Sequence, residues 1–132
     1  MKWISKGKKK TYSIKRLFES FICAGRGVIS AFKTEQNLLI DLICGVLAIV
    51  LGFLLKISTI EFTIILITIA LVISMEIMNT TIEYVVDMAM PEIHPLAKLS
   101  KDISAGAVLV SAIIASIVGL IIYLPKVIVL FR

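Results

Sequence analysis

Four polar residues lie in a part of the chain that is otherwise suited to hydrocarbon. They are Glu76, Asn79, Glu83 and Asp87, and they follow FTIILITIALVIS, a thirteen-residue run without any charge. On a helix, Glu76, Asn79 and Glu83 share a face, since positions i, i+3 and i+7 lie within about 60° of one another. Carboxylates and an amide in this arrangement can bind a hard cation, and a carboxylate can act as a general base.

The composition predicts an all-α integral membrane protein. Of 132 residues, 59% are hydrophobic and 17% are charged, and the mean hydropathy is +1.04, well above that of a soluble domain. The apolar runs are each close to the ~20 residues that cross ~30 Å of hydrocarbon as a helix. Because a backbone in lipid must satisfy its polar groups within the segment, we predict transmembrane helices at residues 36–55, 60–88 and 102–124.

The segment before the first span predicts an amphipathic helix on the membrane surface. Over residues 13–33, apolar residues recur at helical spacing, while Lys15, Arg16 and Glu19 fall on the other side. Such a basic helix beside a membrane is held by burial of its apolar face and by anionic headgroups. With residues 1–12 as a basic tail, we interpret the whole chain as a single membrane-embedded domain.

The positions of lysine and arginine predict the orientation of the chain. Eleven of the fourteen lie in residues 1–33 or in the loop 87–102, and the other three are Lys56, Lys126 and Arg132. By the positive-inside rule, the N-terminus and the loop 87–102 face the cytoplasm and the C-terminus lies outside. Nucleic acid is not expected as a partner, because these lysines lie beside the spans without base-stacking aromatic residues.

This topology predicts that distant polar residues meet at one depth. At ~1.5 Å per residue, Glu76 lies ~24 Å and Glu83 ~35 Å from the outer end of the second span, near the cytoplasmic edge of the hydrocarbon. Glu35 begins the first span at that level, and Lys101 and Asp102 begin the third. Carboxylates at an aqueous boundary bind Mg²⁺ together with phosphates, and lysine binds phosphate. The set therefore favours phosphoryl transfer from a nucleotide to the hydroxyl of a lipid.

Two other interpretations stay open on these residues alone. An intramembrane Asn or Glu can simply hold helices together, worth roughly 0.6 to 2 kcal/mol. Carboxylates can also line the pathway of a small ion- or proton-coupled transporter. The sequence has no G-x-x-x-x-G-K-[ST] motif that would independently indicate a nucleotide site.

A stripe of small residues in the third span predicts close helix packing. The stripe consists of Ala107, Ser111, Ala115 and Gly119, at four-residue spacing. Three spans and one surface helix offer few faces on which to bury polar groups. We therefore expect a homo-oligomer.

Three runs carry a resemblance to a known family. The runs EIMNTTIEYVVD, PEIHPLAKLSKDISAGAVLV and GLIIYLPK resemble the prokaryotic diacylglycerol kinase family, in particular its Gram-positive undecaprenol kinase branch, from about Ser13 to Lys126. The resemblance implies a homotrimer of three-span subunits in the cell membrane of a bacterium. It implies ATP- and Mg²⁺-dependent phosphorylation of a lipid alcohol, with undecaprenol converted to undecaprenyl phosphate. Diacylglycerol, converted to phosphatidic acid, is the alternative acceptor.

The resemblance also implies a role for individual residues. Glu76 matches the family's catalytic base, and Glu35 and Glu83 match the carboxylates that bind Mg²⁺ and hold the nucleotide phosphates. Asn79 is expected to orient phosphate. The other expected nucleotide contacts are Arg16, Glu92, Ile93, His94, Lys101 and Asp102.

The head of the first span departs from the family pattern. After the glutamate, the Gram-positive branch commonly has a basic residue, then Asn, and a histidine further on, whereas this chain has EQNLLID. Gln36 and Asp41 therefore change the charge at the head of this helix. The resemblance assigns no role to Asp41 or Asp87.

Overall fold

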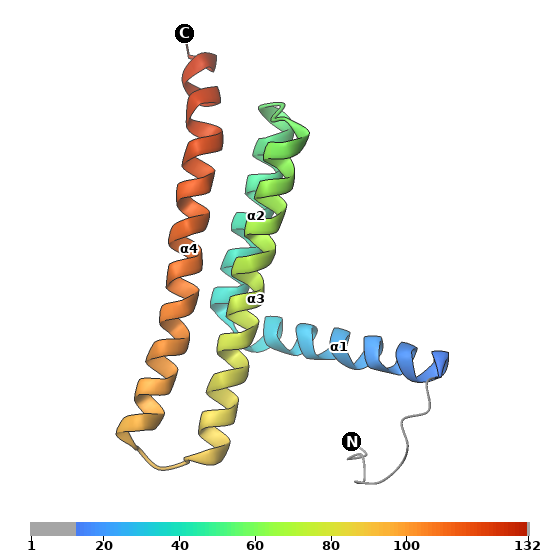
Figure 1. Ribbon diagram of the computed structural model, residues 1–132, viewed down its shortest axis with the longest axis vertical. Coiled ribbons are helices and arrows are strands. Elements are labelled where there is room, and N and C mark those ends of the chain that lie inside the picture. Colours follow the sequence, from blue (N-terminus) through green and yellow to red (C-terminus); the bar gives the residue numbers. More distant parts are fainter. Residues whose placement is uncertain (1–12, 132) are drawn as a thin grey trace.

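The computed structural model describes residues 13–131, so the expected basic tail 1–12 lies outside the described residues. The four helices are α1 (Ile14–Thr34), α2 (Gln36–Leu54), α3 (Thr59–Ala89) and α4 (Pro95–Leu130) (Figure 1). No strand occurs between residues 13 and 131. The predicted all-helical fold is confirmed.

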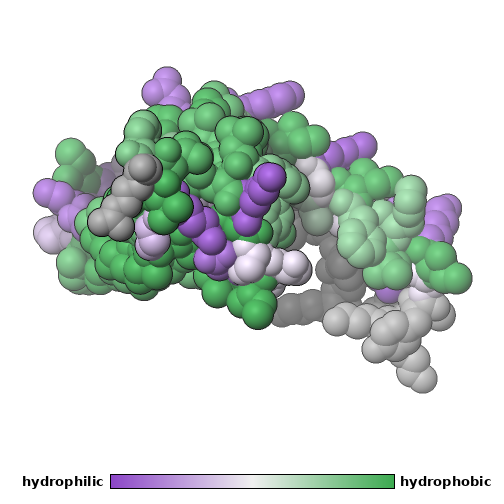
Figure 2. Space-filling model, turned by 90° about the horizontal axis from the view of Figure 1, so that it is seen from above, coloured by the Kyte–Doolittle hydropathy of each residue, from purple (hydrophilic) through white to green (hydrophobic). Residues whose placement is uncertain are grey.

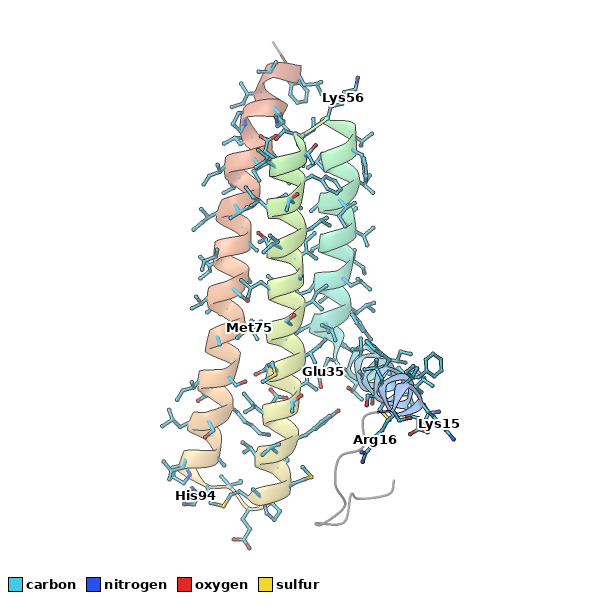
Figure 3. The ribbon with its side chains drawn as sticks, turned by 45° about the vertical axis from the view of Figure 1, so that its right-hand side comes forward. Lys15, Arg16, Glu35, Lys56, Met75 and His94 are labelled. Atoms are coloured by element: carbon cyan, nitrogen blue, oxygen red, sulfur yellow. The ribbon has the colours of Figure 1, made fainter. Side chains whose placement is uncertain are left out.

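Three of these helices are long and apolar enough to cross a membrane. They are α2 with 19 residues, α3 with 31 and α4 with 36. They form an antiparallel bundle in which α3 lies between α2 and α4 and packs against both (Figures 1 and 3). Many large apolar side chains of these three helices are exposed, as expected for helices that face lipid. Seen from above, hydrophobic residues dominate the bundle, with polar residues scattered among them (Figure 2).

The last helix is longer than its hydropathy predicts, since it begins at Pro95 rather than near residue 102 and ends at Leu130 rather than at 124. Proline suits the first turn of a helix, where its missing N–H has no intrahelical partner. His94 caps this turn, because its Nδ1 accepts a hydrogen bond from the Leu96 N–H at 3.2 Å. Near the other end, the helix continues through Pro125.

The turn between α2 and α3 is held by local hydrogen bonds. Lys56 has a φ of 50°, in the left-handed region, at the point where the chain turns from α2 to α3. Ser58 and Glu61 then form a capping box: the Ser58 N–H donates to Glu61 Oε2 at 2.7 Å, and the Glu61 N–H donates to Ser58 Oγ at 3.3 Å. Glu61 also pairs with Lys126 of α4 at 3.2 Å. All three spans are therefore joined at this end, which we call the Lys56 end.

Close packing between α2 and α3 depends on glycine. On α3, a Cβ atom added to Gly45 would lie 2.9 Å from Cγ2 of Ile69, and one added to Gly52 would lie 3.4 Å from the ring of Phe62. Across the bundle, the Tyr123 hydroxyl of α4 donates to the Ala48 carbonyl oxygen of α2 at 2.8 Å. These contacts set the position of each span along its neighbours.

The first helix runs across the bundle instead of along it (Figure 1). It is separated from α2 by one extended residue, Glu35, with φ −107° and ψ 114°. Just beyond this corner, Leu38 is fully buried, and Ala31 is buried on the α1 side. The corner therefore packs against the bundle, and we call this the Glu35 end. The contact of α1 with a membrane surface stays a prediction.

Candidate functional site

The three polar residues predicted to share a face of α3 are at least half-buried, and two of their side chains are joined by a hydrogen bond. Glu76 is buried, with 7% of its surface exposed, and Asn79 and Glu83 are half-buried. Asn79 Nδ2 donates a hydrogen bond to Glu83 Oε1 at 3.1 Å. Next to Asn79, the Thr80 hydroxyl donates to the backbone carbonyl of Glu76, one turn earlier on α3, at 3.1 Å. The face thus presents a buried carboxylate next to an amide and carboxylate that hold each other.

Other carboxylates gather around Glu76. Glu35, Asp41 and Glu83 all lie near enough to interact with its charge. Figure 3 shows Glu35 at the corner of α1 and α2, at the level of the part of α3 that carries Met75. The structure therefore brings the predicted base and both predicted metal ligands to the same end of the bundle, within reach of each other's charge. It adds Asp41, which no sequence pattern had assigned to the group.

The orientation of Asn79 determines what the site can bind. One hydrogen of its amide nitrogen is used by Glu83, and a flipped amide would set two acceptor oxygens against each other. Its Oδ1 is buried and has no hydrogen-bond partner. A buried polar atom without a partner costs about 1–3 kcal/mol, so this oxygen is suited to a cation or to a hydrogen-bond donor. The second N–H of the amide can still donate to a phosphate oxygen, so the role of Asn79 in orienting phosphate stays a prediction.

The donor set fits Mg²⁺ that arrives with phosphates. Within residues 13–131, no three His, Cys, Asp or Glu side chains are grouped closely enough to enclose a metal ion. Glu35 and Glu83 supply two carboxylates, and Asn79 Oδ1 supplies a third hard oxygen nearby. Mg²⁺ commonly binds proteins through one or two carboxylates and completes its octahedron with phosphates and water.

An ion pair between α3 and α4 gives Asp87 a partner. Lys101 Nζ lies 2.6 Å from Asp87 Oδ1, and both side chains are partly exposed. Lys101 is thus held close to the Glu35 end of the bundle, while the neighbouring Asp102 is exposed on α4. The sequence predicts Lys101 as a nucleotide contact, and in the isolated chain its ammonium group is paired with Asp87.

The predicted loop residues lie at the tip of the α3–α4 hairpin. Glu92 and Ile93 are exposed, and His94 is half-buried at the start of α4 (Figure 3). His94 uses its Nδ1 as the cap of that helix, which leaves Nε2 available to a ligand. These residues are at the correct end of the bundle for a nucleotide site, but beyond the level of Glu35.

Arg16 lies far from this group within one chain. It is exposed near the start of α1, nineteen residues before Glu35, which corresponds to ~28 Å along a helix. Figure 1 shows that the start of α1, which carries Arg16, lies at the far end of this helix from its corner with α2. The structure therefore does not bring Arg16 to the carboxylates of its own chain.

A cavity lies between the spans, deeper than the carboxylates of α3. Its volume is about 280 Å³, and Asp41 is its one charged lining residue among the described part of the chain. Most of the wall consists of small or apolar residues of all three spans, including Gly45, Ala115 and Gly119. Asp41 therefore belongs both to the polar group around Glu76 and to the wall of the cavity. In the sequence it is marked by the run EQNLLID, which departs from the family pattern.

Comparison with known proteins identifies the family. The sequence model of the prokaryotic diacylglycerol kinase family matches residues 22–123. This chain belongs to that family. The match includes every residue of the polar group around Glu76.

Three relatives illustrate the range of this prokaryotic diacylglycerol kinase family. The undecaprenol kinase of Bacillus subtilis is 43% identical over 113 residues, which cover 86% of this chain and 92% of that protein. A diacylglycerol kinase of Synechocystis is 42% identical over 110 residues, 83% of this chain and 63% of that protein. The diacylglycerol kinase of Escherichia coli K12 is 29% identical over 107 residues, 81% of this chain and 88% of that protein.

Membership of the prokaryotic diacylglycerol kinase family confirms the predicted enzyme class, a lipid kinase. Together with the three apolar helices, it indicates a bacterial membrane protein. The individual assignments of Glu76, Glu35 and Glu83 remain predictions. The structure adds that Glu35 and Glu83 lie near enough to Glu76 to interact with its charge.

The Asn79 environment predicts a metal-dependent effect on stability. Asn79→Asp replaces the hydrogen bond to Glu83 by repulsion between carboxylates, so unfolding should become easier by about 1–3 kcal/mol without metal. Mg²⁺ should restore more of the thermal midpoint in this variant than in the unmodified chain, measured in detergent with EDTA or MgCl₂. Asn37→Asp makes the same change in the exposed first turn of α2, where a carboxylate is favourable, and serves as the control. An equal effect of Mg²⁺ on all three proteins would contradict the assignment.

Proposed function

We propose that this chain transfers the γ-phosphoryl group of ATP to the hydroxyl of undecaprenol, forming undecaprenyl phosphate. The observation that carries the proposal is the buried Glu76 with Glu35, Asp41 and Glu83 around it, in a chain that belongs to a family of lipid kinases. The similarity to the Bacillus subtilis undecaprenol kinase, over 92% of its length, favours undecaprenol as the acceptor.

Glu76 is the proposed general base. Its carboxylate accepts the proton of the lipid hydroxyl as the hydroxyl oxygen attacks the γ-phosphorus, and the bond from that phosphorus to the leaving oxygen of ADP breaks. Burial of Glu76 suits this task, because the hydroxyl of a lipid can approach from the membrane while little water can.

Glu35 and Glu83 are the proposed ligands of Mg²⁺, and Asn79 Oδ1 is available beside them. The bound ion would neutralise charge on the nucleotide phosphates and hold the γ-phosphoryl group in line with the acceptor. The chain's own part is to bring the Glu35 carboxylate from the α1–α2 corner and the Glu83 carboxylate from α3 to the same end of the bundle. The hydrogen bond from Asn79 keeps the Glu83 carboxylate in place for this purpose.

Several residues are proposed to contact the nucleotide. Lys101 is paired with Asp87 and can pair with a nucleotide phosphate instead, because a carboxylate and a phosphate both offer anionic oxygen acceptors. His94 has Nε2 free for a ligand. The remaining proposed contacts are Arg16, Glu92, Ile93 and Asp102.

Diacylglycerol is the second candidate acceptor. A relative named diacylglycerol kinase is 42% identical over 83% of this chain, almost as similar as the undecaprenol kinase. Both lipids present a primary hydroxyl at the membrane interface, which is all that the proposed base requires. A transporter would use the same carboxylates as a pathway, but membership of a kinase family favours catalysis.

We propose further that the active form is a homotrimer, with the N-terminus and the Glu35 end on the cytoplasmic side. The bias of lysine and arginine toward that side and the location of ATP support the orientation. The distance of Arg16 from Glu76 within one chain supports a site that is shared between subunits.

The acceptor is tested by a direct comparison of the two lipids. Purified chain in bilayers with Mg²⁺ and radiolabelled ATP should phosphorylate undecaprenol with the higher kcat/KM, and diacylglycerol more slowly. Product separation by chromatography measures both reactions in one mixture. A higher kcat/KM for diacylglycerol would make the second candidate the function, and the absence of lipid phosphorylation would reject both.

The base is tested by Glu76→Gln, which keeps the shape of the side chain and removes the proton acceptor. The expected loss in kcat is on the order of 10²–10⁴-fold, with the folded state retained. Glu61→Gln is the matched control, because Glu61 lies on the same helix at the Lys56 end and pairs with Lys126. It should keep kcat within about twofold while losing some thermal stability. Full activity of Glu76→Gln would reject the assignment.

The shared site is tested by mixing two inactive forms. Chains with Arg16→Ala and chains with Glu76→Gln, reassembled together, should recover activity that neither has alone, because a trimer can combine Arg16 of one chain with Glu76 of another. Native mass spectrometry in detergent should count three chains. Failure of the mixture to exceed its components would place Arg16 outside the shared site.

A further inference from the structure

One hydrogen bond joins two helices next to the proposed Mg²⁺ ligands. The Tyr84 hydroxyl of α3 donates to Thr34 Oγ1 of α1 at 3.1 Å, between residues fifty positions apart in the chain. Thr34 is able to accept, because its own hydroxyl hydrogen is directed to the backbone carbonyls of Ser30 at 3.1 Å and Ala31 at 3.2 Å. The Tyr84 hydroxyl is therefore the donor of this hydrogen bond, and the Thr34 hydroxyl oxygen is its acceptor.

The two residues are direct neighbours of the proposed metal ligands. Thr34 is the last residue of α1 and precedes Glu35, the single extended residue before α2. Tyr84 follows Glu83 on α3. Side chains on a helix lean toward its N-terminus, so Tyr84 reaches from the last turns of α3 back toward the corner of α1 and α2.

Apolar packing holds the backbone of this corner, since Leu38 and Ala31 are buried. Ala31 is the one buried residue of α1 among those described, and most of α1 projects away from the bundle (Figure 1). Within residues 13–131, no other side-chain hydrogen bond or ion pair joins α1 to α3. The bond from Tyr84 to Thr34 is therefore the one polar side-chain restraint between these two helices next to Glu35.

We propose that Thr34 and Tyr84 form a positioning pair that holds Glu35 opposite Glu83 and thereby sets the affinity for the Mg²⁺–nucleotide complex. Neither residue touches the lipid or takes part in proton transfer. The inference rests on the proposed function, because it uses Glu35 and Glu83 as the metal ligands. It concerns a contact that this sequence makes through a tyrosine directly after the metal-binding glutamate.

The test is Tyr84→Phe, which removes the hydroxyl and keeps the ring. The KM for Mg·ATP and the half-saturating Mg²⁺ concentration should rise roughly two- to tenfold, the effect of one net hydrogen bond. The kcat and the KM for the lipid should stay within about twofold. Thr34→Val should reproduce this pattern, and Thr34→Ser, which keeps the acceptor, should behave like the unmodified chain.

A matched control and a second readout separate positioning from general stability. Tyr123→Phe also removes a tyrosine hydroxyl that joins two helices, but it lies toward the Lys56 end, at the Ala48 carbonyl. It should lower the thermal midpoint without changing the Mg·ATP dependence. Binding of Mn²⁺ with a non-hydrolysable ATP analogue to the full chain in bilayers, followed by electron paramagnetic resonance, should weaken in Tyr84→Phe by the same factor as the kinetic constant.

The outcomes are distinguishable. If the unmodified chain phosphorylates lipid and Tyr84→Phe has an unchanged Mn²⁺ affinity and KM for Mg·ATP, the positioning pair is rejected while the kinase stands. If Thr34→Val combined with Tyr84→Phe weakens binding by the product of the single effects, the two residues act independently and the pair is also rejected. If the unmodified chain neither binds Mn²⁺-nucleotide nor phosphorylates lipid, the proposed function fails and this inference fails with it.

Discussion

The cost of placing carboxylates in hydrocarbon determines how this chain is built. A charged side chain near the centre of a bilayer is strongly unfavourable, whereas one near the end of a span is tolerated. The central helix α3 has 31 residues, ~46 Å, which is longer than the ~30 Å of hydrocarbon. The excess length carries Glu83 at one end, while Asn79 lies at the edge of the hydrocarbon and Glu76 just inside it. Every other feature of the site, from the α1–α2 corner to the start of α4, meets α3 at that end.

The two ends of the bundle are stabilised differently. At the Lys56 end, a capping box, the pair of Glu61 with Lys126 and the close approach at Gly52 fix the three spans to one another. At the Glu35 end, carboxylates repel one another and Asn79 Oδ1 has no partner. Such imbalance is typical of functional sites, where polar groups are arranged for a ligand rather than for the stability of the free protein. A cation between Glu35 and Glu83 would remove both defects at once.

Periodicity and hydropathy predicted the parts of the structure that depend on local sequence. The three spans and the common face of Glu76, Asn79 and Glu83 follow from helical geometry, which the sequence specifies residue by residue. Hydropathy predicted the span 102–124 but does not mark where α4 begins, because the first turns of this helix are polar and are marked by Pro95 and His94. The pair of Lys101 with Asp87 and the bond of Tyr84 with Thr34 join different helices. Contacts of this kind depend on helix rotation and side-chain direction, which spacing alone does not specify.

Asn79 shows how such a contact can add to the chemistry inferred from a residue type. An asparagine near phosphates is readily interpreted as a donor, since its amide can bind phosphate oxygens. In this chain Glu83, one turn further along α3, takes one of the two N–H donors, which leaves the second N–H and the carbonyl oxygen for ligands. The same hydrogen bond keeps the Glu83 carboxylate from rotating freely. Asn79 can therefore serve a cation through Oδ1 and a phosphate through its second N–H, which suits a site where the two arrive together.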